Sequence, residues 1–303
     1  MPAIGLVAQG TWKGAEPFFA RLRQGLAEYG FVEGKNFRFE LREANYQFDR
    51  LPALYRELAD QKVSVMLAET TAKLEAAKAA TQSIPIVFVT GIDPVENGFI
   101  ASFSKPGANI TGIFNLTSTL IGKELEILHE LVPAAKKFAF LTDPGNMTLR
   151  KLSLASIQAA ADSLGLNLLN VNAHVSSEFE AAIETAVRAG AGGMILGPDI
   201  LFNHLERQLQ LVNIAARYRL PTIYFYESTV RNAGGLIGYG SDPDEGDRAM
   251  GRYAGRILKG EKPADMPATQ PTKTILIINL KTAKALGITV PTALLVRADE
   301  VIE

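Results

Sequence analysis

Residues 84–115 read IPIVFVTGIDPVENGFIASFSKPGANITGIFN, and this stretch decides the fold. It opens with an apolar run at 84–89 whose β-branched and aromatic residues are typical of a buried strand. The run ends at 90–94, where small and polar side chains take over, and a helical piece and a Pro-Gly turn are expected next. A second apolar segment follows at 110–116. We interpret the first strand as one wall of a ligand cleft and the second segment as a crossing between two lobes.

Strands and helices alternate on both sides of this stretch, which favours parallel, doubly wound sheets. In the first half, strands are expected at 3–8, 36–42, 63–68 and 84–89, and helices at 17–29, 49–61 and 71–81. In the second half, strands are expected at 138–141, 166–171, 194–196 and 220–226, and helices at 152–164, 177–189 and 203–218. The two halves look like two versions of one αβ lobe.

We expect the last part of the chain to complete both lobes. Its expected elements are a strand at 236–240, a helix at 244–258, a Pro-rich linker at 262–272, a strand at 274–278 and a helix at 280–286. The prediction is therefore an α/β protein with two doubly wound, Rossmann-like lobes joined by a three-segment hinge. Lobe 1 is expected to comprise 1–115 and 237–266, and lobe 2 to comprise 116–236 and 267–303.

Composition excludes several classes of protein. A hydrophobic content of 47% and a charged content of 21% are typical of a globular protein of 303 residues. The net charge of -1 gives no electrostatic reason to expect nucleic acid. Cysteine is absent, which removes thiol nucleophiles, thiolate metal sites and disulfides together.

Enzyme motifs and metal-ligand spacings are also absent from the sequence. The three histidines, His129, His174 and His204, are scattered without the spacing of a metal site. The sequence has no GxGxxG after the first strand, no GxxxxGK[ST] and no GxSxG. We therefore expect neither an enzyme nor a bound cofactor or metal. A hydrolase or lyase that uses Asp and Glu has no motif to support it.

The candidate ligand-binding residues lie where the expected strands end, because open parallel sheets bind ligands at the carboxyl ends of their strands. They are Gln9, Thr11, Trp12, Glu69, Thr70, Thr71, Thr90, Gly91, Asp93, Asn115, Asp143, Asn146, Asp199, Tyr226, Glu227 and Tyr239. Asn115 belongs to the second apolar segment and is expected at the floor of the cleft.

Several of these residues have two readings. Thr70 and Thr71 begin a helix, so they are suited to hold a carboxylate, and they are equally suited to act as an ordinary N-cap. Asp93, Asp199 and Glu227 are suited to face a ligand ammonium, or to serve as turn and capping residues.

The aromatic candidates for a cleft wall are Trp12, Tyr224, Tyr226 and Tyr239. Tyr224 and Tyr226 share one face of an extended strand, so one or both are also candidates for the core. Trp12 is the only tryptophan and lies in a polar loop, which favours a place in the lid or wall of the cleft.

Longer stretches resemble a known family, the solute-binding components of ABC transporters, which includes tryptophan- and phenylalanine-binding members. They read GLAEYGFVEGKN at 25–36, DRLPAL at 49–54, ELVPAAKKFAFL at 130–141, RYRLPTIY at 217–224, GGLIGYG at 234–240, ILKGEKPADMPATQPTKTILIINLKTAKALGITVP at 257–291 and LLVRADEVIE at 294–303, together with 84–115 itself. The likeness runs nearly from end to end, and it is most specific in the C-terminal third.

The resemblance implies a type I periplasmic binding protein fold, a ligand in the cleft between the lobes, and closure of the lobes on binding. It also implies a periplasmic or exported protein whose signal is absent from this sequence, although the first residues alone read as cytosolic. Small hydroxyl residues in amino-acid-binding relatives take the α-carboxylate and ammonium, and they correspond here to Thr70, Thr71 and Thr90. This sequence departs at Glu69, where a small residue is expected and where a carboxylate is able to repel an anionic ligand.

The function implied is the solute-binding component of an ABC importer. Its ligand is expected to be an aromatic or hydrophobic amino acid or a related aromatic carboxylate, its partner an ABC permease, and its state a monomer. The alternatives left open are a sensory module that reports ligand to a receptor and a binder of another small solute such as a nucleoside. A transcriptional regulator of this fold needs a DNA-binding headpiece, and the first expected strand begins at residue 3.

Overall fold

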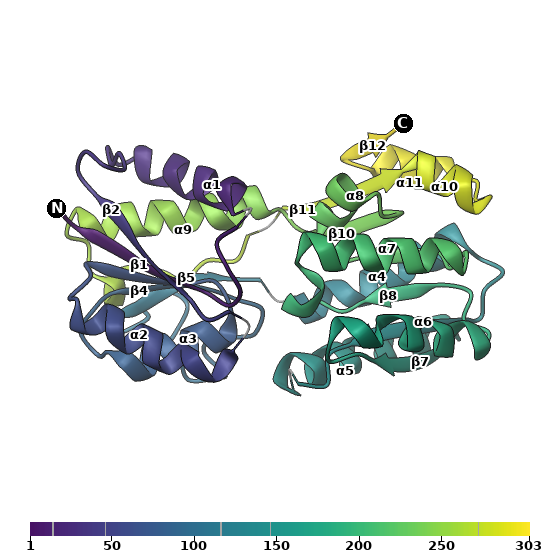
Figure 1. Ribbon diagram of the computed structural model, residues 1–303, viewed down its shortest axis with the longest axis horizontal. Helices are drawn as coiled ribbons and strands as arrows, with labels where there is room; N and C mark the ends of the chain where they lie inside the picture. The colour runs from purple at the N-terminus through teal and green to yellow at the C-terminus, as the bar shows by residue number, and fades with distance from the viewer. Residues whose placement is uncertain (14, 46, 116, 146, 272) are drawn as a thin grey trace. The chain divides into compact units, whose positions relative to one another are not determined.

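The chain folds into two compact units, shown by a computed structural model (Figure 1). The structure describes residues 1–13, 15–45, 47–115, 117–145, 147–271 and 273–303. The N-terminal unit comprises Met1–Leu116 and Asp242–Lys273, and the C-terminal unit comprises Thr117–Ser241 and Thr274–Glu303. The chain therefore passes from one unit to the other three times.

Five parallel strands form the sheet of the N-terminal unit in the order β2-β1-β3-β4-β5. The strands are β1 (Ala3–Ala8), β2 (Arg38–Glu43), β3 (Val65–Ala68), β4 (Ile86–Thr90) and β5 (Ile110–Phe114). Helices α1 (Glu16–Ala27) and α9 (Pro243–Leu258) lie on one face, and α2 (Leu51–Asp60) and α3 (Thr71–Ala80) lie on the other (Figure 1). The 3-10 helices are η1 (Phe48–Arg50) and η4 (Pro263–Asp265). The expected doubly wound sheet is confirmed, with β2 at its edge.

The alternation of side chains along the strands explains the two-sided core of this unit. Ile4 and Leu6 of β1 are fully buried and point toward α1 and α9. Helix α9 comes from far along the chain, yet its Met250 and Tyr253 belong to the same cluster. Successive strand residues face opposite sides of the sheet, so strands that are buried along their whole length read as continuous apolar runs.

Two glycines allow α1 and α9 to approach closely. A Cβ on Gly25 would lie 2.1 Å from the carbonyl oxygen of Arg248, and a Cβ on Gly251 would lie 2.3 Å from the carbonyl oxygen of Leu22. Both distances are far below any van der Waals contact, so no other residue fits at either position without separating the helices. The contact ties the last segment of the N-terminal unit to its first helix.

The C-terminal unit has a seven-stranded sheet in the order β12-β11-β10-β9-β8-β6-β7. Its strands are β6 (Lys137–Thr142), β7 (Asn167–Asn172), β8 (Met194–Leu196), β9 (Thr222–Tyr224), β10 (Ile237–Ser241), β11 (Thr274–Asn279) and β12 (Glu300–Ile302). All neighbours are parallel except β10 and β11, which pair in antiparallel fashion. Its helices are α4 (Thr117–Leu131), α5 (Met147–Leu164), α6 (Phe179–Arg188), α7 (Leu205–Arg217), α8 (Glu227–Ala233), α10 (Leu280–Leu286) and α11 (Thr292–Arg297), with 3-10 helices η2 (Ser176–Glu178) and η3 (Ile200–Phe202).

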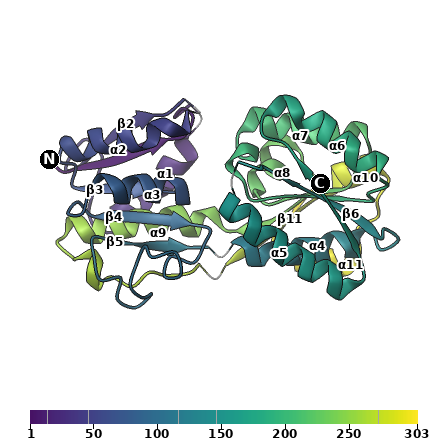
Figure 2. The same cartoon turned by 90° about the horizontal axis from the view of Figure 1, so that it is seen from below.

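Helices cover both faces of this second sheet. Figure 2 shows α6, α7 and α8 on one side and α4, α5 and α11 on the other. Within β6, Phe138 and Phe140 pack with α4 and α5, whereas Ala139 and Leu141 pack with α6 and α7. The period-2 alternation of one buried strand thus builds two separate hydrophobic clusters.

Three details differ from the sequence-based expectation. Residues 94–107 form turns and bends, and the expected helical piece there is wrong. Strand β10 hydrogen-bonds to β9 and β11, so 237–241 complete the second sheet and do not belong to lobe 1 as expected. Residues 267–271 belong to the N-terminal unit, because Thr269 bridges Ile113 of β5.

Candidate functional site

Each sheet has a point at which the strand order reverses, and such switch points are where open α/β sheets bind ligands. In the N-terminal unit the chain runs from β1 outward to β2 and then back to β3 on the other side of β1, so the switch point lies between β1 and β3. In the C-terminal unit β7 and β8 flank β6 in the same way, so the switch point lies between β6 and β8. The ends of β1, β3, β6 and β8 therefore border the two switch points.

A hydrogen bond joins the two strand ends at the N-terminal switch point. Gln9 follows β1, and its Nε2 donates to Oγ1 of Thr70, which follows β3, at 3.3 Å. Thr70 is also the N-cap of α3, since its hydroxyl oxygen accepts from the backbone N–H of Lys73. The capping interpretation of Thr70 is confirmed, and it places the hydroxyl at the strand-end edge of the sheet. The neighbouring hydroxyls of Thr71 and Thr90 form a hydrogen bond of 2.8 Å, which connects α3 to the end of β4.

An ion pair lies directly behind these threonines. Lys73 donates to Oε1 of Glu69 and is only 3% exposed, so the ammonium is held inside the unit. The other carboxylate oxygen of Glu69, Oε2, is buried and has no hydrogen-bond partner among the described residues. The charge of Glu69 adds to burial in raising the pKa of Tyr55, whose hydroxyl donates to the carbonyl oxygen of Leu67. Glu69 is therefore held by Lys73 at one carboxylate oxygen and buried at the other.

The end of β5 adds a further polar group to this edge. The backbone N–H of Asn115 donates to the carbonyl oxygen of Thr90 at 2.8 Å, which places the two residues side by side. Oδ1 of Asn115 is buried and without a partner among the described residues, as is Oε1 of Gln9. Gly91 follows Thr90 and is partly exposed. The structure thus brings together Gln9, Glu69, Thr70, Thr71, Thr90, Gly91 and Asn115.

Asp93 has a local structural role beside this group. Its Oδ1 accepts from the backbone N–H groups of Val95 at 2.7 Å and Glu96 at 3.0 Å, as in a turn built by an aspartate side chain. Thr11, in the loop after β1, is exposed. Among the described residues, neither the Asp93 nor the Thr11 side chain hydrogen-bonds to the polar cluster formed by Gln9 and the threonines.

Trp12 packs against the edge of the sheet instead of standing free in its loop. Its indole N–H donates to the carbonyl oxygen of Arg42 at 3.0 Å, and its backbone N–H donates to Oε1 of Glu43 at 2.8 Å. Its ring centroid lies 5.1 Å from that of Phe19 and 6.4 Å from that of Phe18. Trp12 is therefore the end of an aromatic cluster between α1 and β2.

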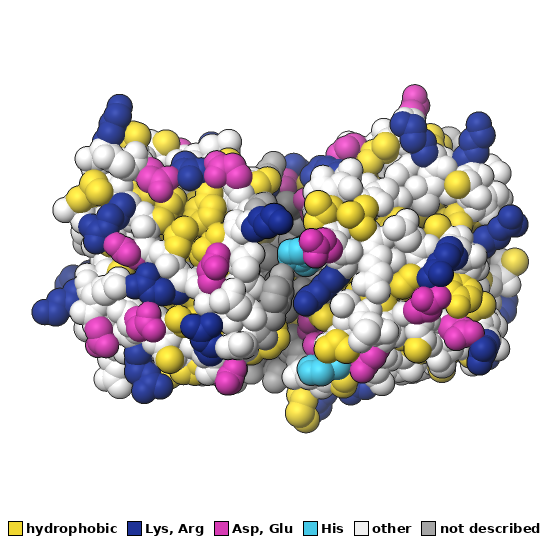
Figure 3. Space-filling view, in the orientation of Figure 1, with side chains coloured by type: hydrophobic (Ala, Val, Ile, Leu, Met, Phe, Trp, Pro, Cys, Tyr) yellow, Lys and Arg dark blue, Asp and Glu magenta, His cyan; other side chains and the backbone are white. Residues whose placement is uncertain are grey.

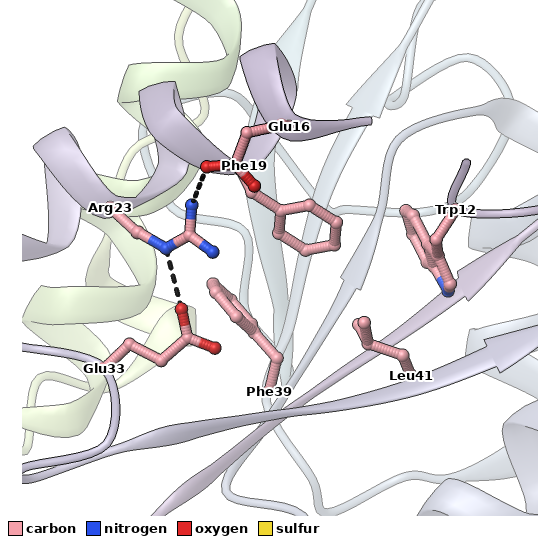
Figure 4. A pocket seen from close by; sticks show the side chains of 7 residues that line it. All are labelled: Trp12, Glu16, Phe19, Arg23, Glu33, Phe39 and Leu41. Atoms are coloured by element: carbon pink, nitrogen blue, oxygen red, sulfur yellow. Dashed lines mark hydrogen bonds and ion pairs between the residues drawn. The ribbon is translucent and has the colours of Figure 1, made fainter. Parts of the chain in front are cut away.

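This cluster lines a hollow of about 290 Å³ in the surface of the N-terminal unit (Figure 4). Its lining residues are Trp12, Glu16, Phe19, Arg23, Glu33, Phe39 and Leu41. Figure 4 shows the Arg23 guanidinium between Glu16 and Glu33, with ion-pair distances of 2.6 and 2.7 Å. Figure 3 shows hydrophobic side chains exposed on the N-terminal unit among acidic and basic ones. The hollow lies between α1 and the edge strand, away from the switch point between β1 and β3.

At the C-terminal switch point, a smaller hollow lies between the ends of β6 and β8. It is lined by Thr142, Asp143, Leu149, Arg150, Ser153, Gly197, Pro198 and Asp199. Asp143 and Asp199 were expected at these strand ends, whereas Arg150 and Ser153 were not. Asn146, also expected there, lies outside the described residues.

Both carboxylates of this hollow are bound to neighbouring groups. Oδ1 of Asp143 accepts from the backbone N–H of Gly145 at 2.7 Å and lies 2.8 Å from Nδ1 of His174. The hydrogen bond and charge of Asp143 raise the pKa of the exposed His174. Oδ1 of Asp199 accepts from the backbone N–H of Leu201, a residue of η3, at 2.9 Å.

Arg150 and Ser153 belong to the first two turns of α5 and face the same hollow. The Arg150 guanidinium donates from Nε to Thr142 Oγ1 at 3.3 Å and from Nη2 to Asn172 Oδ1 at 3.3 Å. If the Asn170 amide is turned over, its oxygen accepts from the same Nη2 at 2.9 Å. The hydroxyl of Ser153 is 1% exposed and has no partner among the described residues.

Two of the aromatic candidates lie near this switch point. Tyr224 ends β9 and is 2% exposed, so it belongs to the core, and burial raises its pKa. Tyr226 is partly exposed and its hydroxyl donates to the carbonyl oxygen of Pro198 at 3.4 Å, while burial and the charge of Asp199 raise its pKa. Tyr239 of β10 packs partly against the cluster formed with α4.

Glu227 has a structural role at the start of α8. Its Oε2 accepts from the backbone N–H of Ser228 at 2.6 Å, and its Oε1 lies 3.4 Å from the guanidinium of Arg231. Glu227 is the first residue of α8, and the N-cap position before it, Tyr226, makes no side-chain cap hydrogen bond.

Two further features concern the described ranges of the chain, 1–13, 15–45, 47–115, 117–145, 147–271 and 273–303. Those ranges contain no cluster of three or more His, Asp or Glu side chains arranged to hold a metal ion. Within the same ranges, no helix has both the length and the apolar character needed to cross a membrane. The chemistry of both switch points is therefore that of hydroxyl, amide, carboxylate and guanidinium groups.

The chain is similar to known proteins over most of its length. Residues 18–302 match the protein family described as ABC transporter substrate binding protein. A curated protein named "Tyrosine-binding protein" from Clostridioides difficile (strain R20291) is 28% identical over 268 residues, which cover 87% of this chain and 74% of the relative.

Solved structures resemble the whole chain. A conserved domain protein from Vibrio cholerae has a TM-score of 0.88 with 23% identity, and the match covers 99% of both chains. The ABC domain from Streptococcus pneumonia, solved in complex with L-Trp, has a TM-score of 0.87 with 21% identity over 99% of both chains. These likenesses show the type I periplasmic binding protein fold, which was expected from the sequence. The chain belongs to the ABC transporter substrate-binding protein family.

Proposed function

We propose that the protein binds a small aromatic or hydrophobic amino acid, or a related aromatic carboxylate, and presents it to an ABC permease. The observation that carries this proposal is the presence of polar groups at both switch points, Gln9 and Thr70 in one unit and Thr142 and Arg150 in the other. Switch points are the usual ligand positions in open α/β sheets. The names of the tyrosine-binding relative and of the L-Trp complex support an amino acid as the ligand class.

The mechanism we propose is a shift of population between open and closed arrangements of the two units. A ligand that touches both switch points stabilises the closed arrangement, and only its differential affinity for that arrangement moves the equilibrium. The three passages of chain between the units would serve as the hinge. In this scheme the protein acts outside the cytoplasm, and the permease recognises the closed form.

Isothermal titration of the purified protein against the twenty amino acids and a set of aromatic acids tests the proposal. We expect one or a few aromatic or branched amino acids to bind with a dissociation constant in the micromolar range or below. Native mass spectrometry of freshly purified protein gives an independent reading, because a retained ligand adds its own mass. Absence of binding across the whole panel would refute an amino-acid-binding function.

A further inference from the structure

Strand β2 is an open edge of the five-stranded sheet. It pairs with β1 on one side, and the described part of the chain places no strand on its other side. The backbone N–H of Arg38 donates to the carbonyl oxygen of Pro2, and that of Ala44 to the carbonyl oxygen of Ala8. Backbone groups alternate in direction along a strand, so the even-numbered residues of β2 bond to β1. The residues whose N–H and C=O groups face outward are Phe39, Leu41 and Glu43.

The face of β2 toward α1 is apolar at this edge. Phe39 and Leu41 line the hollow of about 290 Å³ together with Trp12 and Phe19 (Figure 4). Leu41 is 36% exposed, and Phe39 is partly exposed. A strand that paired with β2 would therefore cover apolar surface as well as satisfy the outward backbone groups.

The face of β2 toward α2 carries charges that alternate in sign, in the order Arg38, Glu40, Arg42. Within the chain, Arg38 lies 2.7 Å from Glu40, and Arg42 lies 3.0 Å from Glu57 of α2. Charged side chains usually protect an edge strand from pairing. A row of alternating charges is different, because a reversed copy of the same row can place opposite charges across from each other.

The backbone directions allow only some registers for two antiparallel β2 strands. The outward residues of the two strands must lie opposite each other, so a twofold axis passes through one residue and not between two. With the axis at Leu41, Glu40 of each copy lies opposite Arg42 of the other. With the axis at Glu40, two glutamates face each other and Arg38 faces Arg42, and with the axis at Arg42, two arginines face each other. Opposite charges across a pair of strands are stabilising and like charges are destabilising, so the charges select the axis at Leu41.

We propose that the chain forms a symmetric dimer with a second copy of itself, in which the two β2 strands pair in antiparallel fashion about Leu41. The two five-stranded sheets then form one continuous sheet, and the two Leu41 side chains meet beside the hollows. Arg42, whose Nη1 donates to the carbonyl oxygen of Leu41 at 2.9 Å in the single chain, turns to Glu40 of the second copy. The same patch is used on both copies, so the assembly closes at two.

This dimer goes beyond the proposed function and does not depend on which ligand binds. It departs from the monomer that was expected from the sequence. Only one short strand of each copy supplies the backbone pairing, so the interface is of the small, transient kind and the association is weak.

Sedimentation equilibrium of the full chain measures the association at protein concentrations from about 10 μM to about 1 mM, the range that suits a weak interface. We expect the average mass to rise from 32.7 kDa toward twice that value. Glu40→Arg and Arg42→Glu each place like charges opposite each other at two positions, and each should weaken the dimer about tenfold or more. The double variant Glu40→Arg with Arg42→Glu restores opposite charges and should recover the dimer to within about threefold.

Leu41→Lys places two positive charges at the twofold axis and should remove the dimer. Leu209→Lys is the matched control, because Leu209 is a leucine of similar exposure, 40%, on α7 of the C-terminal unit. It should leave the association unchanged. Thermal unfolding of each variant shows whether it is folded.

Hydrogen exchange of single amides, followed by NMR on the unchanged protein, tests the register without any substitution. At high protein concentration, exchange should slow at the outward N–H groups of Phe39, Leu41 and Glu43. Exchange at Glu40 and Arg42, which already bond to β1, should not change.

Three results would overturn the proposal. The first is a mass of one chain at every concentration, which would leave the edge of β2 free or reserved for a strand of another protein. The second is a dimer without slower exchange at the three outward amides, since it would form through another surface. The third is a double charge variant that associates no better than the single ones, because the charges would then not set the register.

Discussion

The fully buried Glu124 of α4 should lower the stability of the C-terminal unit by an amount that grows with pH. Its exposed fraction is 0%, neither of its carboxyl oxygens has a partner among the described residues, and burial raises its pKa well above the ordinary value of 4.5. A carboxyl that is neutral in the folded chain and ionised in the unfolded chain takes up a proton on folding. Between pH 4.5 and the raised folded pKa, this uptake lowers the stability by about 1.36 kcal/mol for each pH unit.

The substitution that tests this is Glu124→Gln, which keeps the shape of the side chain and removes its titration. Burial raises the pKa of Glu124 in the folded chain. The unchanged protein therefore loses stability as the pH rises from 4.5 toward that raised pKa. The variant has no titrating group at this position and does not show this loss. We expect the stability advantage of the variant to be smallest at pH 4.5 and to grow by about 1.36 kcal/mol for each pH unit until the folded pKa of Glu124 is reached. Urea unfolding at several pH values, followed through the transition of the C-terminal unit, measures the difference.

Glu126→Gln is the matched control on the same helix, since the Glu126 side chain is 48% exposed and pairs with Lys123. It should change stability little and without this dependence on pH. A stability difference for Glu124→Gln that stays constant between pH 5 and pH 8 would show that Glu124 does not titrate as a buried acid, and the reasoning would be wrong.

Three further predictions follow from individual contacts. Thr70→Ala removes the N-cap of α3 and should destabilise the N-terminal unit by about 1 kcal/mol while weakening ligand binding; unchanged unfolding and an unchanged dissociation constant would contradict it. The interaction with Asp143 raises the pKa of His174. The contribution of this interaction to the stability of the folded chain is therefore complete at pH 5.5, and it is lost as the pH rises through the folded pKa of His174. His174→Asn should therefore lower the melting temperature at pH 5.5 and not at pH 8.5. Gly25→Ala should cost about 1–3 kcal/mol because its Cβ would meet the carbonyl oxygen of Arg248, and a melting temperature equal to that of the unchanged protein would refute the close helix contact.

The periodicity of the sequence predicted most of the strands and helices, but not β12 or α4, and 110–114, expected in a crossing between the lobes, is strand β5 of the first sheet. The helix expected at 280–286 has those bounds in α10, because Asn279 caps it and Gly287 ends it in a left-handed conformation. The strand expected at 220–226 was too long, since Tyr224 ends β9 and Glu227 begins α8. The alternating aromatic residues continue through Tyr226, so periodicity alone did not show that the strand had ended.

The sequence predicted which residues follow the strands, but it did not predict the directions of their side chains. Gln9 and Thr70 were found because each follows a buried strand, and the structure joins them by a hydrogen bond. Trp12 was expected in a cleft wall, but its position depends on contacts with Phe19 and with the carbonyl oxygen of Arg42. The local sequence pattern does not predict these contacts. Arg150 was missed because the expected helix began at residue 152, whereas α5 begins at Met147.

The late return of the chain to both units has a consequence for how the protein is made. Helix α9 supplies Met250 and Tyr253 to the core of the N-terminal unit, and β11 supplies Ile277 and Ile278 to that of the C-terminal unit. Neither core is complete until almost the whole chain has left the ribosome. Contacts between residues so far apart in sequence form slowly, because the long intervening loop must close first. Each unit is therefore expected to reach its full stability only late in synthesis, once α9 and β11 have been made.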